Sequence, residues 1–171
     1  MSKEEIIGVL KAHSERVIVP PARPIYISRS ALWTTAFRQF SRPSFIKKHG
    51  MLYVTFACDE HGSQEDAADL GGPRREFFRL LVKAIFQDSG AFQKSPNGFV
   101  PRMHVSWVSS GLFHTIGQMM STILVQGGEP HAFLARCVVD YILTGDVMKV
   151  CVNTDYIPDT LLRESLKKVL Y

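Results

Sequence analysis

Two nearby segments decide the fold of this chain: residues 52–56, Leu-Tyr-Val-Thr-Phe, and residues 71–78, Gly-Gly-Pro-Arg-Arg-Glu-Phe-Phe. In the first, apolar side chains alternate with Tyr53 and Thr55, which is typical of a strand with one buried face. In the second, glycine permits a tight turn, and Pro73 suits a first helical position because that position needs no amide hydrogen. The spacing predicts a strand over Met51–Ala57 and a helix over Arg74–Gln87, with one apolar stripe made by Phe77, Leu81 and Ile85.

Capping residues and turn residues predict the remaining elements. Ser2 and Glu5 form a capping box for a helix that ends near His13. Ser30 is predicted to cap a helix that ends at Pro43, and Asp159 to cap the last helix. The other predicted elements are a strand over Ile25–Ile27, a loop over Asp88–Arg102, a helix over Ser110–Gln126, a helix from Pro130 to Gly145, and a strand or loop over Val147–Val152.

These elements predict an α+β domain that is predominantly helical, with a few short strands. Pro20, Pro21 and Pro24 exclude a helix. We therefore expect residues 1–24 to be an N-terminal helix with a proline-rich linker, and residues 25–171 to be the domain proper.

The composition excludes disordered, collagenous and coiled-coil proteins. The 171 residues are 46% hydrophobic and 21% charged, with a formal net charge of +4. The first 50 residues carry a balance of +6. Spread over that length it predicts a solvated basic face, and we expect no nucleic-acid partner.

The cysteines and the N-terminus indicate the compartment. Cys58, Cys137 and Cys151 are an odd number without zinc-type spacing, and the apolar neighbours of the last two predict buried thiols in a reducing environment. The N-terminus has no apolar signal region, and no apolar run is long enough to cross a membrane. The sequence therefore predicts a cytoplasmic or nuclear protein without a membrane partner.

No known catalytic, cofactor or metal signature is present. The glycines at 71 and 72 are not followed by the Lys-Ser/Thr of a phosphate loop, and the acidic run from Asp59 to Asp69 lacks the spacing of a calcium loop. His114 is expected to be a hydrogen-bonded core residue, and Glu76 to complement the helix dipole and pair with a neighbouring arginine. We expect no catalytic residue, no cofactor and no metal site.

The same two segments, with Asp59-Glu-His-Gly62 between them, resemble the opening of a HECT ubiquitin-ligase domain. The most specific part is an Asp-x-Gly-Gly motif followed by Arg-Glu and two aromatic residues. Gly90-Ala-Phe92, the helix over 111–126 and the segment 133–145 also have counterparts, so the resemblance spans residues 25–171. The residues matching the family motif are Asp69, Gly71, Gly72, Arg75, Glu76, Phe77 and Phe78, and their expected role is structural.

The resemblance implies the large subdomain of the N-terminal lobe. In this family the remainder of that lobe docks the ubiquitin-conjugating enzyme, and a C-terminal lobe holds the cysteine that accepts ubiquitin. Neither has a counterpart in the 171 residues, residues 63–68 are an insertion, and Lys94 stands where some members have a ubiquitin-binding aromatic. We expect a structural part of a ligase, inactive alone, whose partners in the full ligase are ubiquitin and a conjugating enzyme.

Two other functions remain open. The first is a non-catalytic module that binds ubiquitin, a conjugating enzyme or another ligase. It is favoured by the apolar residues around Leu161–Tyr171, because an uncovered apolar face invites a partner or self-association. The second is an unrelated small enzyme or nucleic-acid binder, for which salt-dependent binding to duplex would be the sign.

Overall fold

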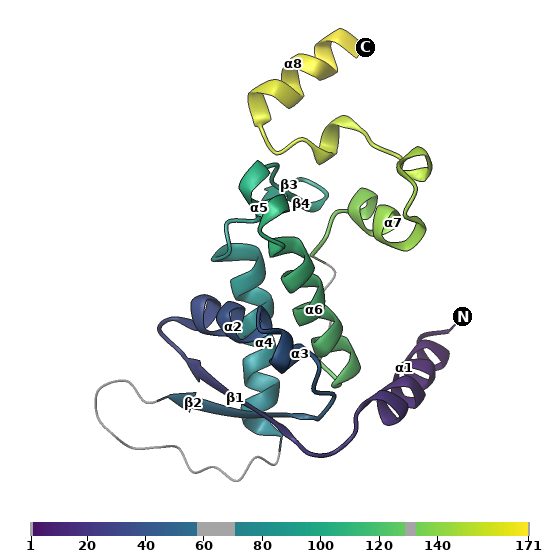
Figure 1. Cartoon of the computed structure of the whole chain (residues 1–171). Helices are drawn as coiled ribbons and strands as arrows, with labels where there is room; N and C mark the ends of the chain where they lie inside the picture. Colours follow the sequence, from purple (N-terminus) through teal and green to yellow (C-terminus); the bar gives the residue numbers. More distant parts are fainter. Residues whose placement is uncertain (1, 58–70, 129–132, 171) are drawn as a thin grey trace.

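The computed structural model describes residues 2–57, 71–128 and 133–170, and is shown in Figure 1. Helices predominate in this part of the chain, and the strands form two separate two-stranded sheets, so the α+β class is confirmed. In chain order the elements are α1 (Lys3–Val17), β1 (Arg23–Ser28), α2 (Leu32–Phe40), α3 (Pro43–Ile46), β2 (Leu52–Ala57), α4 (Gly72–Gln87), β3 (Phe92–Ser95), β4 (Gly98–Pro101), α5 (Val105–Ser109), α6 (Leu112–Val125), α7 (Arg136–Thr144), the 3-10 turns η1 (Val147–Lys149) and η2 (Thr154–Tyr156), and α8 (Thr160–Leu170).

The first sheet is a parallel pair, β1 beside β2, with α2 and α3 in the connection between them. Both predicted strands are confirmed. Ile25 lies opposite Val54 and Ile27 opposite Phe56, and all four side chains are buried, whereas Tyr26 and Tyr53 face outward. The period-two alternation follows from successive strand side chains pointing to opposite faces.

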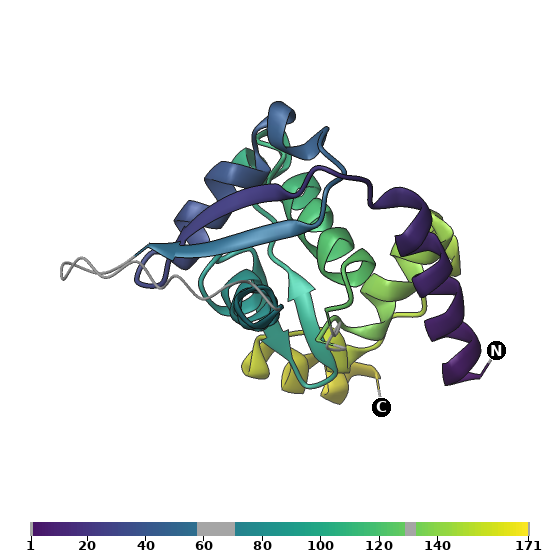
Figure 2. The ribbon, with the colours of Figure 1, turned by 90° about the horizontal axis from the view of Figure 1, so that it is seen from below.

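Helices α4 and α6 form the centre of the core. Figures 1 and 2 show the two helices side by side, with the β1–β2 sheet and α2 on one side of them. Phe77, Leu81 and Ile85 of α4 and Met119 and Ile123 of α6 are almost completely buried. The helix predicted over Arg74–Gln87 is therefore confirmed, and its apolar stripe lies in the core.

The prediction of a loop over Asp88–Arg102 is wrong. Most of this segment is the antiparallel hairpin β3–β4, in which Phe92 lies opposite Pro101. The turn residues Pro96 and Asn97 are the tip of the hairpin. The glycine, proline and asparagine residues of the segment favour a loop, and two strands of only four residues each give little alternation to set against them.

Two predicted helix starts are also wrong. Pro130 lies outside the described residues, and α7 begins only at Arg136, because the segment before it pairs with β4: Phe99 donates to the carbonyl of Phe133 at 2.7 Å, and Ala135 donates to that of Phe99 at 2.9 Å. Ser30 is not the cap of α2. The cap position is Ala31, whose amide donates to the hydroxyl of Ser28 at 3.3 Å.

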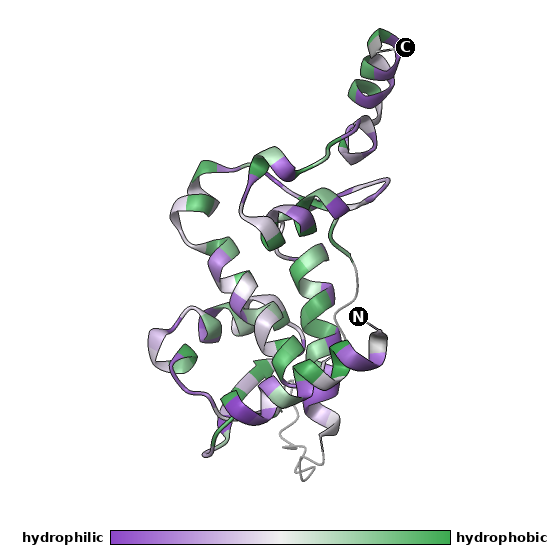
Figure 3. Cartoon of the chain, turned by 90° about the vertical axis from the view of Figure 1, so that its right-hand side faces the viewer, coloured by the Kyte–Doolittle hydropathy of each residue, from purple (hydrophilic) through white to green (hydrophobic). Residues whose placement is uncertain are grey.

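Both ends of the described chain lie at the periphery. The capping box of Ser2 and Glu5 is confirmed, although α1 continues past His13 to Val17 before it meets α6. From α7 onward the chain leads away from the α4–α6 core, and α8 stands apart from it in Figures 1 and 3. Asp159 caps α8 as predicted, by accepting from the amide of Leu162 at 2.9 Å. None of the helices in the described part is long and apolar enough to cross a membrane.

Candidate functional site

The residues that match the sequence motif lie together at the start of α4. Gly71 is the N-cap and has a φ of 94°, a left-handed conformation that other residues rarely adopt. Gly72 and Pro73 form the first turn. Asp69 lies outside the described residues, so its expected structural role stays a prediction.

Glu76 holds this helix start against the end of β1. Its carboxylate accepts from both terminal nitrogens of Arg29, and the Nη2–Oε2 distance is 3.1 Å. The Arg29 guanidinium also lies 3.9 Å above the ring centre of Phe56 on β2. Hydrogen bonding to Arg29 holds the pKa of Glu76 below its usual range, because it stabilises the charged carboxylate. The expectation that Glu76 pairs with an arginine beside it in sequence is wrong, since its partner comes from another element.

The two aromatic residues of the motif have a packing role. Phe77 and Phe78 are buried, with ring centres 6.0 Å apart, and Phe78 faces the glycine turn that ends α6. Arg75 is exposed. The described motif residues therefore fix a helix start between the β1–β2 sheet and α6, and none of them is a nucleophile.

The two cysteines within the described residues differ in exposure. Cys137 is buried at the start of α7, and burial raises the pKa of its thiol because the thiolate loses solvation. Cys151 is exposed, so the prediction that it is buried is wrong: it follows η1 in the segment that leads away from the core. Cys58 lies outside the described residues. Only the thiolate is nucleophilic, so accessibility favours Cys151 over Cys137.

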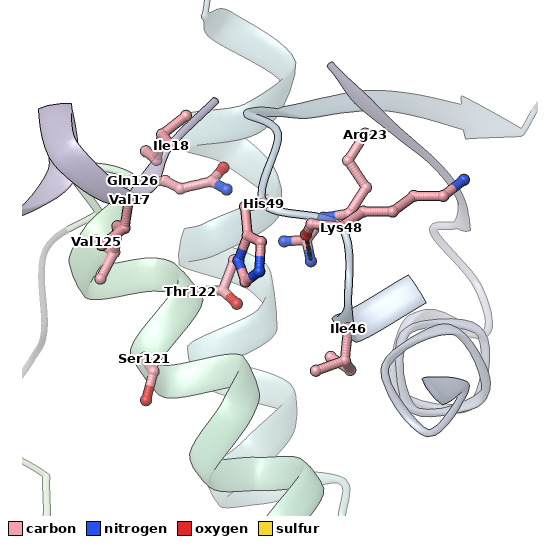
Figure 4. Close-up of a pocket in the computed structure, with 10 residues that line it drawn as sticks. All are labelled: Val17, Ile18, Arg23, Ile46, Lys48, His49, Ser121, Thr122, Val125 and Gln126. Carbon is pink, nitrogen blue, oxygen red and sulfur yellow. Dashed lines mark hydrogen bonds between the residues drawn. The ribbon is translucent and has the colours of Figure 1, made fainter. Parts of the chain in front are cut away.

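A cleft of about 170 Å³ lies apart from the motif, none of whose residues lines it. It is enclosed by the end of α1, the start of β1, the chain from the end of α3 toward β2, and the C-terminal half of α6 (Figure 4). Its lining is Val17, Ile18, Arg23, Ile46, Lys48, His49, Ser121, Thr122, Val125 and Gln126. Figure 4 shows the Arg23 guanidinium and the His49 ring turned toward this space, and the Lys48 ammonium turned away from it.

Arg23 is a buried cation in this cleft, with only 5% of its surface exposed. Its Nη1 donates to the carbonyls of Phe45 at 3.2 Å and Lys48 at 3.0 Å, and its guanidinium lies 4.5 Å from the ring centre of Phe45. No sequence motif marks this residue. A signal was present, because the alternation that buries Ile25 and Ile27 puts Arg23 on the same inward face.

The histidines of the described part do not assemble into a site. His114 is exposed on α6, with its Nε2 3.0 Å from the side-chain nitrogen of Gln118, so the expectation of a core histidine is wrong. His104 stacks on Trp107, with ring centres 4.9 Å apart, on the short helix α5. In residues 2–57, 71–128 and 133–170, no three metal-ligating side chains gather where an ion would fit.

Comparison with known proteins finds no matching family model and no matching curated protein.

Proposed function

We propose that this chain is the large subdomain of a HECT-type N-terminal lobe, and that it serves as a structural part of a ubiquitin-protein ligase. In the full ligase it would hold the subdomain that docks the conjugating enzyme and the lobe that carries the acceptor cysteine. Such a role has a physical basis, because transfer between two thioester sites depends on how they are positioned. Its partners would be ubiquitin and a conjugating enzyme, in the cytoplasm or nucleus.

The observation that carries the proposal is the way the motif residues are used. Gly71 takes a left-handed turn, Glu76 binds Arg29 across to the sheet, and Phe77 and Phe78 enter the core. All four are therefore structural, as the resemblance implies. A chance match has no reason to place these four residues in supporting contacts.

We also propose that the chain by itself does not accept or transfer ubiquitin. An acceptor cysteine must be exposed and must form a thiolate readily. Cys137 is buried and the pKa of its thiol is raised, and the exposed Cys151 lies in the segment that leads away from the core.

A discharge assay tests this proposal. Conjugating enzymes loaded with ubiquitin are mixed with the 171-residue chain and analysed on gels with and without reductant. We expect the conjugating enzymes to lose ubiquitin at the same rate with and without the chain. We expect no ubiquitin adduct on the chain. An adduct that reductant removes would overturn inactivity, and the single variants Cys58→Ser, Cys137→Ser and Cys151→Ser would identify the acceptor.

The family assignment has its own test. The chain is fused to the missing parts of a known HECT ligase, replacing that enzyme's large subdomain at matching strand and helix boundaries. We expect a folded chimera that accepts ubiquitin on its own acceptor cysteine. A chimera that folds with a cooperative unfolding transition yet never accepts ubiquitin, while the parent enzyme does, would count against the assignment.

One observation favours a second candidate, a non-catalytic interaction module. The segment from α7 to α8 exposes many apolar side chains, among them Leu161 at 81% and Val169 at 82%. The further exposed members are Tyr141, Ile142, Leu143, Val147, Met148, Val152 and Leu162. Exposed apolar surface of this kind marks a contact with another protein or with a second copy.

Light scattering tests whether that surface makes the chain self-associate or leaves it monomeric. If the α7–α8 segment self-associates, the mass should rise with concentration, and Leu161→Asp with Val169→Asp should restore the monomer mass. The matched control is Tyr26→Asp, an equally drastic change on the outer face of β1. A strict monomer at high concentration would remove self-association, and the module would then require ubiquitin or a ligase component as its partner.

A further inference from the structure

The guanidinium of Arg23 is held in place on one side only. Its Nη1 is fixed by the carbonyls of Phe45 and Lys48, and the ring of Phe45 covers one face. Its Nε is buried and has no hydrogen-bond partner. Within the described part of the chain, Nη2 makes no hydrogen bond and no carboxylate forms an ion pair with this residue.

This arrangement leaves a binding edge unused. The Nε–H and one Nη2–H of an arginine point the same way, and together they match the two oxygens of a carboxylate. A buried donor without a partner costs about 1–3 kcal/mol, and more when the group is charged. Arg23 carries this cost beside a cleft, and a ligand that satisfies both nitrogens would remove it. Because Nε is closed to solvent, such binding requires a small movement of the lining that opens the Nε edge to the cleft.

The lining of the cleft limits the ligand. Val17, Ile18, Ile46 and Val125 provide aliphatic walls around the polar end formed by Arg23. At about 170 Å³ the cleft is smaller than the ~300–1,000 Å³ of pockets that bury whole drug-sized molecules. It has room for one charged group on a short aliphatic stem.

We propose that this cleft binds a carboxylate on a short aliphatic stem, through the Nε and Nη2 of Arg23. The ligand is either the side chain of a glutamate on a partner protein or a small free carboxylic acid, since both present the same group. This site is separate from the motif at α4, and its existence does not depend on the proposed ligase role.

Nuclear magnetic resonance of the arginine Nε–H groups tests the proposal directly on the full chain. The probes are sodium butyrate and a blocked tripeptide with a central glutamate, with sodium chloride at equal ionic strength as the reference. We expect a saturable shift of the Arg23 signal. Arg163 is the internal control, because its guanidinium also donates to a carbonyl, that of Ile157 at 2.9 Å, but on α8. Its signal should not move.

The probes also distinguish the source of the carboxylate. Tighter binding of the tripeptide than of butyrate assigns the site to a protein partner, and the reverse order assigns it to a small acid. The same tripeptide with glutamine in place of glutamate should not bind. Inorganic phosphate that binds more tightly than either carboxylate would overturn the choice of ligand, and equal shifts of Arg23 and Arg163 would overturn the site.

Two variants keep the test informative. Arg23→Lys keeps the charge but loses the paired edge, so we expect butyrate to bind at least about tenfold more weakly. Because this change also removes the bonds to Phe45 and Lys48 and could unfold the chain, Thr122→Leu is the second variant. The Thr122 hydroxyl bonds only to the carbonyl of Gln118 in its own helix, so leucine fills the cleft without freeing a distant partner.

Thr144→Leu is the matched control for the second variant, because the Thr144 hydroxyl also donates to a carbonyl of its own helix, that of Asp140 at 2.8 Å, and its other partner is the backbone of Asp146, two residues on. We expect Thr122→Leu to abolish the Arg23 shift and Thr144→Leu to preserve it. Unchanged butyrate binding by a folded Thr122→Leu chain would show that the carboxylate lies elsewhere.

Discussion

Arg29 and Glu76 form a two-point ion pair that joins the end of β1 to the start of α4, although 47 residues separate them in the chain. The pair is only partly exposed, with each side chain at 37%. It connects the parallel sheet to the helix that forms the centre of the core. The motif glutamate is thereby a residue of the fold, and its removal has measurable consequences.

Replacing Glu76 with glutamine should lower the free energy of unfolding by up to about 1 kcal/mol at pH 7, the range of partly exposed ion pairs. The pKa of Glu76 is lower in the folded chain, so the carboxylate adds stability above its unfolded pKa and loses it as the pH falls through the folded value. Urea unfolding should therefore distinguish the variant from the parent at pH 7 and not in strong acid. Glu164→Gln, on the exposed face of α8, is the control, and an equal loss there would contradict a role for the pair.

The two motif glycines should respond unequally to alanine. Gly71 has a φ of 94°, so Gly71→Ala should cost about 1–2 kcal/mol of left-handed strain. Gly72 has no positive φ, and apart from its chain neighbours nothing lies within 4 Å of its Cβ direction. Gly72→Ala therefore meets only the ring of Pro73 and should cost less than Gly71→Ala. Thermal unfolding of both variants decides this, and equal losses would mean that the turn is not left-handed.

Phe77 should be among the most sensitive positions of the core. Its side chain is fully buried, and truncation to alanine should cost about 3–5 kcal/mol. Tyr53→Ala, on the outward face of β2, should cost much less because that ring is half exposed. Urea unfolding of the two variants measures the difference, and similar costs would contradict the placement of Phe77.

Native alkylation should separate the cysteines. Iodoacetamide should modify exposed Cys151 more than about tenfold faster than Cys137, which is buried and has a raised pKa that lowers its thiolate fraction. Mass spectrometry of peptides taken over time measures both rates. In denaturant the two rates should converge, and a persistent difference there would mean that local sequence, not burial, sets the reactivity.

Local signals account for the elements that the sequence predicted well. The alternation in β1 and β2, the apolar stripe of α4, and the caps at Ser2 and Asp159 each depend on residues a few positions apart. The same local signals give a wrong prediction where a segment pairs with one that is far away in the sequence. The segment before α7 pairs with Phe99 of β4 through backbone hydrogen bonds. Phe133 and Leu134 are therefore extended, although their apolar pattern suits a helix.

The candidate sites also contain some residues that local sequence predicts and others that depend on tertiary contacts. The sequence indicated the motif at α4, including the buried aromatics and the glycine turn, because these follow from spacing and backbone preference. It indicated neither Arg29 as the partner of Glu76 nor Arg23 in the cleft. Both depend on which side chains the folded chain brings together.

By itself, the sequence determined the class of the fold, the strand and helix at its centre and the absence of any familiar catalytic motif, because periodicity and capping act over one or two turns of chain. Only the tertiary structure decided that Arg23 is a buried cation with no carboxylate partner among the described residues, that Cys151 is exposed, and that the segment after α7 leaves its apolar side chains uncovered. Burial and charge pairing are properties of distant segments in contact, and local patterns do not encode them.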